Sequence, residues 1–206
     1  MSRSFRSVLA GLVGASIVLV VGVSGCTARS ASPEGSRNFY ESLDLSSPVA
    51  AVETFSDAFA RDDFMTVWLA LDLGAQKRLE TDFNLLQWGL LIDVDAVPDI
   101  HAEIQAAYSF ENIDSDEMWY NFDRAMMIAD RNDAYLVDLS GTVVPGDESV
   151  VPGAGSVVVE VPAVVEGIEG EVRFRLVQSP SGRWRVYQVI VPGGDEALVP
   201  WSVPQS

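Results

Sequence analysis

Residues 47–64, SPVAAVETFSDAFARDDF, decide the fold class from which the rest of the chain is interpreted. Serine is a favoured N-cap and proline is favoured at the first helical position, so Ser47-Pro48 predicts a helix start. The apolar residues that follow recur at helical spacing on one face: Val49, Val52, Phe55 and Phe59. We expect this helix to end near Arg61-Asp62-Asp63, whose aspartates cap a second short helix over residues 64–71.

Two longer helical patterns follow this pair. The first covers residues 75–91, and its apolar side carries Leu79, Phe83, Leu86 and Leu90. The second opens at Ser115, where Asp114 and Glu117 have the spacing of a capping box. Its apolar face consists of Met118, Phe122, Met126 and Ala129.

After Asn132-Asp133 the period of the apolar residues changes from 3.6 to 2, which is typical of β-strands. We expect strands over residues 135–140, 157–161, 172–177 and 184–190. Helices followed by a meandering antiparallel sheet predict an α+β domain over residues 47–191. Pro192-Gly193-Gly194 ends the last strand, so residues 192–206 are predicted to be an irregular C-terminal tail.

The register of the last hairpin follows from its apolar residues. A three-residue loop at 180–182, with Gly182 in the left-handed region, keeps them on one face. This register pairs Val172 with Ile190, Leu176 with Val186, and Arg175 with Tyr187. A one-residue slip would expose the whole apolar set, so we expect this register.

The same hairpin gathers four basic residues on its predicted outer face: Arg173, Arg175, Arg183 and Arg185. Two interpretations remain open. Either they pair with nearby carboxylates, each pair contributing about 0–1 kcal/mol, or they form a docking edge for an acidic partner or an envelope polymer.

The outline resembles the NTF2-like (SnoaL-like) superfamily of cone-shaped α+β domains. The resemblance is carried by residues 47–55, by residues 58–64, and by SGRWRV at 181–186, a turn into a final strand that begins with tryptophan. It implies a curved antiparallel sheet wrapped around the first helix, often with an apolar cavity between them. Members include isomerases, dehydratases, transport factors and non-catalytic lipoprotein domains.

In such a cone, five residues are candidates for lining the cavity and binding a small apolar ligand: Phe55, Phe59, Tyr135, Phe174 and Gln188. The alternative is that the aromatic residues simply fill the core. Gln188 needs a hydrogen-bond partner there, because burying an unpaired amide costs roughly 1–3 kcal/mol.

Catalysis is the second hypothesis for the domain. The steroid isomerases of this superfamily use an aspartate base, a tyrosine and a second acid. Here the first helix carries no tyrosine on its buried face, and Asp138 is predicted to point outward. We therefore expect a non-catalytic domain that binds a ligand or a protein and assign no catalytic residue, with an extracytoplasmic isomerase or dehydratase as the alternative.

The first 26 residues carry a targeting signal. Arg3 and Arg6 precede an uncharged apolar stretch over residues 7–25. Its end, Val23-Ser24-Gly25-Cys26, resembles the lipobox of bacterial lipoproteins. We expect a signal peptide over 1–25 and a lipidated Cys26, followed by a flexible tether to residue 46. The alternative is a retained membrane helix in which the cysteine is incidental.

The composition excludes several other classes. With one cysteine and one histidine, the chain has no intramolecular disulfide and no cysteine-rich zinc site, and we expect no metal and no cofactor. The net charge of −17 argues against nucleic-acid binding. The expected location is the extracytoplasmic face of a bacterial cell membrane, attached through Cys26, with a small apolar ligand or an envelope protein as partner.

Overall fold

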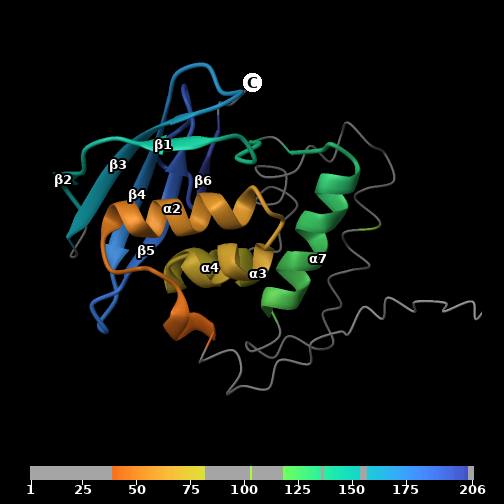
Figure 1. The fold of residues 1–206 in the computed structure, drawn as a ribbon, viewed down its shortest axis with the longest axis horizontal. Coiled ribbons are helices and arrows are strands. Elements are labelled where there is room, and N and C mark those ends of the chain that lie inside the picture. Colours follow the sequence, from red (N-terminus) through yellow and green to blue (C-terminus); the bar gives the residue numbers. More distant parts are fainter. Residues whose placement is uncertain (1–38, 82–102, 104–117, 136, 154–156, 204–206) are drawn as a thin grey trace, which may run out of the picture. The chain divides into compact units, whose positions relative to one another are not determined.

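Helices and a mixed β-sheet make up the described part of a computed structural model, residues 39–81, 103, 118–135, 137–153 and 157–203 (Figure 1). The named helices are α2 (Pro48–Phe59), α3 (Phe64–Ala70), α4 (Leu73–Thr81) and α7 (Met118–Arg131). The strands are β1 (Val143–Pro145), β2 (Ser149–Val151), β3 (Val158–Val165), β4 (Glu171–Gln178), β5 (Trp184–Ile190) and β6 (Trp201–Ser202). This arrangement confirms the α+β class.

The predicted start of the first helix is confirmed. The Ser47 hydroxyl accepts a hydrogen bond from the Ala50 N–H at 3.1 Å, and Pro48 opens α2. Phe55 and Phe59 are buried on the face that contacts the sheet, where α2 meets β1, β3 and β5. Asp63 caps α3 by accepting from the Thr66 N–H at 3.2 Å, so the second helix is confirmed as well.

The two longer helical patterns are present over the part that the structure describes. α4 covers the beginning of the first pattern, and residues 82–91 lie outside the described residues. α7 belongs to the second pattern, whose predicted capping box at 114–117 also lies outside them. The buried side chains of α7 include Phe122, Met126 and Ala129, as its periodicity predicts.

The sheet is antiparallel except at one edge. β1 and β2 both pair with β3, which pairs with β4, and β4 pairs with β5. β6 pairs with β5 in parallel, so the prediction of a wholly antiparallel sheet is wrong for this last pair.

Of the predicted strand over residues 135–140, residues 137–140 join no strand of the sheet, Tyr135 is a single bridge residue, and residue 136 lies outside the described residues. The Asp138 carboxylate accepts a hydrogen bond from the Ser140 N–H at 2.8 Å, which closes a local turn instead of continuing an extended ladder. The first strand after α7 is therefore β1, which begins at Val143.

The last hairpin has the predicted loop but a different register. Gly182 is left-handed, with a φ of 80°, and Leu176 pairs with Val186, as expected. Beyond that pair, Tyr187 is an extra residue in β5, so Arg175 pairs with Gln188 and Arg173 with Ile190. Because of this β-bulge, two predicted pairs are wrong: Val172 with Ile190, and Arg175 with Tyr187. It turns Val189, rather than Gln188, toward the core.

The segment after residue 191, which the sequence pattern places outside the domain, contributes a strand and part of the core. The Val189 N–H donates to the Pro200 carbonyl at 2.8 Å, and the Val191 N–H donates to the Ser202 carbonyl at 3.0 Å. The Trp201 indole is buried, with its ring 6.3 Å from that of Phe55. At the other end, Leu45 of the predicted tether is also buried.

We expect Trp201→Ala to lower the free energy of unfolding by about 3–5 kcal/mol, because it leaves a cavity beside α2. Chemical denaturation of the chain measures this change. Trp201→Phe is the control, and we expect it to lower the free energy of unfolding clearly less. It keeps an aromatic ring beside Phe55, and it removes an indole N–H that has no hydrogen-bond partner among the described residues. Equal stability of Trp201→Ala and the parent chain would contradict a structural role for this segment.

Candidate functional site

The aromatic residues predicted to line a cavity do meet, but they form a filled core. The ring of Phe55 lies 6.5 Å from that of Phe59 and 6.1 Å from that of Phe174. All three side chains are at most 1% exposed. The ring of Tyr135 joins them at 5.4 Å from Phe59. The core interpretation therefore describes Phe55, Phe59 and Phe174, whereas Tyr135 is half-buried at the edge of this cluster.

Gln188, the fifth candidate, lies on the opposite face of the sheet. Its side-chain amide N–H groups donate to the carbonyls of Glu196, at 2.9 Å, and Leu198. Its amide oxygen accepts from Arg175 at 3.3 Å. The expectation that Gln188 faces the first helix is thus wrong, because the bulge at Tyr187 reverses its direction. The amide instead holds residues 196–198 against the outer face of the sheet.

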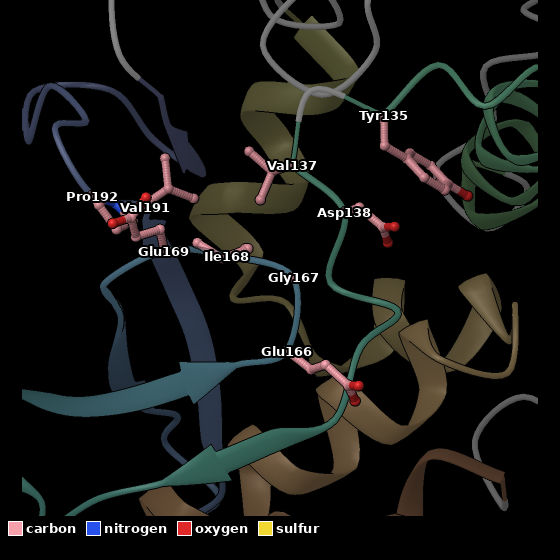
Figure 2. Close-up of a pocket in the computed structure, with 9 residues that line it drawn as sticks. All are labelled: Tyr135, Val137, Asp138, Glu166, Gly167, Ile168, Glu169, Val191 and Pro192. Carbon is pink, nitrogen blue, oxygen red and sulfur yellow. The ribbon is translucent and has the colours of Figure 1, made fainter.

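A cavity of about 460 Å³ lies beside Tyr135 (Figure 2). The residues lining it include Tyr135, Val137, Asp138, Glu166, Ile168 and Glu169. A tyrosine and several carboxylates therefore border one space, which is the combination that an isomerase site requires.

Two of the groups that line this cavity, the Tyr135 hydroxyl and the Glu166 carboxylate, make hydrogen bonds within the protein. The Tyr135 hydroxyl donates to the Met126 carbonyl at 3.1 Å, and Figure 2 shows its side chain directed toward α7. Burial, with the neighbouring carboxylates of Asp130, Asp62 and Asp138, raises the pKa of Tyr135 and keeps its phenol protonated. The Glu166 carboxylate accepts from the Thr142 hydroxyl at 3.0 Å.

The four arginines of the hairpin divide into two pairs, of which the first is neutralised within the protein. Arg175 donates to Glu160 at 2.9 Å and to Glu196 at 2.7 Å, and Arg173 donates to Glu196 at 2.8 Å. The hydrogen bonds from Arg173 and Arg175 hold the pKa of Glu196 below its usual range. For these two arginines, pairing with carboxylates is the interpretation that describes the structure.

The second pair holds the segment that leads to the N-terminus. The guanidinium carbons of Arg183 and Arg185 lie 4.5 and 4.7 Å from the centre of the Tyr40 ring, within the range of cation–π contacts. Arg183 also donates to the carbonyls of Glu41, at 3.2 Å, and Leu43. Arg185 donates to the Tyr40 hydroxyl at 3.1 Å. No single patch of four free cations is present.

A second space, of about 480 Å³, lies over the outer face of β4 and β5. We call it the outer-face groove and define it by six of its lining residues: Arg78, Arg175, Arg185, Tyr187, Gln188 and Glu196. α4, the bulge and the C-terminal segment each contribute to it. Sequence reasoning missed the groove, because only the bulge places Tyr187 and Gln188 together on this face. The clustering of arginines on the hairpin was the one signal that pointed to it.

Comparison of the chain with protein families, with curated proteins and with solved structures finds no match. Within the described residues, no helix is both long and apolar enough to cross a membrane. In the same part of the chain, histidine, cysteine and carboxylate side chains form no group of three suited to binding a metal ion.

We expect Glu196→Gln to lower the melting temperature more at pH 7 than at pH 3. The pKa of Glu196 is lower in the folded chain than in the unfolded one, so its contribution to stability is present above the unfolded pKa and is lost as the pH falls through the folded pKa. Thermal melts at both pH values measure the effect, and Glu148→Gln, at an exposed residue between β1 and β2, is the control. The same loss at both pH values would contradict the assignment.

We expect Tyr135→Phe to cost about 0.5–1.5 kcal/mol of stability, because it removes the hydrogen bond to the Met126 carbonyl. Tyr120 on α7 is 51% exposed, so Tyr120→Phe is a matched control with little effect. Denaturant titration of the two variants measures the difference. Equal stabilities would show that the Tyr135 hydroxyl is not held by α7.

Proposed function

We propose that the chain is a bacterial lipoprotein, anchored through Cys26 on the extracytoplasmic face of the membrane, whose domain binds a partner without catalysing a reaction. The only cysteine of the chain follows Val23-Ser24-Gly25, the position at which a lipobox requires it. The uncharged stretch over 7–25 and the serine-rich segment after Cys26 suit a signal peptide and a tether. Two or more acyl chains would give stable anchoring.

We further propose that the domain is NTF2-like (SnoaL-like). Support comes from the proline-started first helix lying on the sheet, from the short capped helix after it, and from the hairpin whose last strand begins at Trp184. Because aromatic side chains fill the core, we place the binding site for a ligand or protein on the outside of the domain. A small apolar ligand beside Phe55 and Phe174 would have to displace buried side chains.

The observation that carries binding rather than catalysis is the hydrogen bond of Tyr135. An isomerase-type site needs a tyrosine hydroxyl that donates to the substrate. Here that hydroxyl donates to the Met126 carbonyl, and burial raises its pKa. The isomerase or dehydratase alternative therefore lacks a free tyrosine hydroxyl at the cavity beside Tyr135.

We expect Cys26→Ala to abolish lipidation and processing. Mass spectrometry of the parent chain should show an N-terminus at Cys26 carrying a diacylglyceryl group, whereas Cys26→Ala keeps Met1 and carries no lipid. Ser24→Ala is the matched control, because it preserves a small residue before the cysteine and should be processed normally. An unmodified Cys26 or an intact Met1 in the parent chain would contradict the anchoring proposal.

A further inference from the structure

We infer that the outer-face groove binds a small organic anion with an apolar body. The inference rests on the proposed function, because it assigns a ligand class to a domain that binds rather than catalyses. The groove has the size of small-molecule sites, which commonly enclose about 300–1,000 Å³.

The first argument is the state of the positive charges that line the groove. Arg175 is neutralised by Glu160 and Glu196. Arg78 and Arg185 make no ion pair with any carboxylate in the described part of the chain. Arg124 and Arg183 likewise make no ion pair among the described residues, but neither of them lines the groove. In the groove, guanidinium groups without an ion pair among the described residues border an open space in which an anion can bind.

The second argument is that Arg185 is held in position. Its Nε–H donates to the Tyr40 hydroxyl at 3.1 Å, and one terminal nitrogen donates to the Leu71 carbonyl at 3.4 Å. A guanidinium has five N–H donors, so these two bonds orient the group without exhausting it. A ligand that meets an already ordered side chain loses less conformational entropy on binding.

The third argument is the apolar surface beside these cations. Leu73, at the start of α4, is 63% exposed and lines the groove, together with Val177 of β4 and the ring of Tyr187. Covering an exposed leucine is favourable, at about 25 cal/mol per Å² of apolar surface removed from water. A ligand with an anionic head and an apolar body would satisfy both kinds of surface.

In the other two spaces that border the described residues, most of the charged lining residues are acidic. The cavity beside Tyr135 is lined by Asp138, Glu166 and Glu169. The third space has four carboxylates, Asp44, Glu53, Asp57 and Asp63, against a single arginine. The groove, with Arg78, Arg175 and Arg185 against Asp72 and Glu196, is therefore the one of these three spaces that is lined by more arginines than carboxylates.

A small anion suits this groove better than an acidic macromolecule does. The net charge of −17 would repel a large polyanion that approaches the surrounding surface. A small ligand touches only the groove, where the local charge is positive. For the hairpin, we therefore replace docking of an acidic macromolecule with binding of a small anion. Arg185 would contact this anion, and Arg78 would supply the second positive charge.

Saturation-transfer NMR on the full-length chain in uncharged detergent tests this inference, with benzoate and phenyl phosphate as anionic probes and benzamide as the neutral probe of matching shape. We expect both anions to bind saturably, benzamide to bind at least about fivefold more weakly, and the affinity for the anions to fall as salt is raised.

Arg78→Gln is the decisive variant, because Arg78 is exposed and its loss should leave the fold intact. We expect it to weaken benzoate binding about two- to fivefold, and Arg78→Glu to weaken it further. Lys77→Gln removes the same charge from the neighbouring position of α4, outside the groove lining, and should change the affinity less than twofold.

Equal binding of benzoate and benzamide, or equal affinity of Arg78→Glu and the parent chain, would overturn the inference. Binding of poly-glutamate without binding of benzoate would also overturn it and would assign the groove to an acidic macromolecule. The lipidation of Cys26 is measured independently of the groove, so failure of the anchoring proposal is distinguishable from failure of this one.

Discussion

The extra residue in β5, Tyr187, is the constraint on which much of the remaining structure depends. Without it, strict alternation from Val186 would direct the amide of Gln188 into an aromatic core. With it, Val189 fills that position, and the Gln188 amide reaches the carbonyls of Glu196 and Leu198 on the other face. An unpaired buried amide is costly, so the bulge and the attached C-terminal segment stabilise one another.

That attachment explains how the charges of the hairpin are arranged. Once residues 196–198 lie on the sheet, Glu196 forms ion pairs with both Arg173 and Arg175 and, together with Glu160, balances their two charges. The same segment brings β6 beside β5 and buries Trp201 against Phe55. One backbone irregularity therefore determines an edge of the sheet, part of the core and one wall of the outer-face groove.

Because aromatic side chains fill the core, a ligand site has to be sought on the surface of the domain. The rings of Phe55, Phe59, Phe174 and Trp201 occupy the space between α2 and the sheet, where a cone-shaped domain would hold an apolar ligand. Three spaces outside this core remain open to a ligand: among their charged lining residues, carboxylates predominate in two and arginines in the third, the outer-face groove. The sign of the charge, more than the size of the space, distinguishes them.

The sequence by itself determined the features that depend on neighbouring residues: the Ser47 and Asp63 caps, the apolar faces of α2 and α7, the left-handed Gly182 and the alternation along β4. Local hydrogen bonds and side-chain periodicity are sufficient for these. Only the tertiary structure decided the bulge, the parallel β6, the contacts of Tyr40 and Glu196 with the arginines, and hence the groove. Each of these joins segments distant in sequence, and no local pattern encodes which distant partner a side chain will meet.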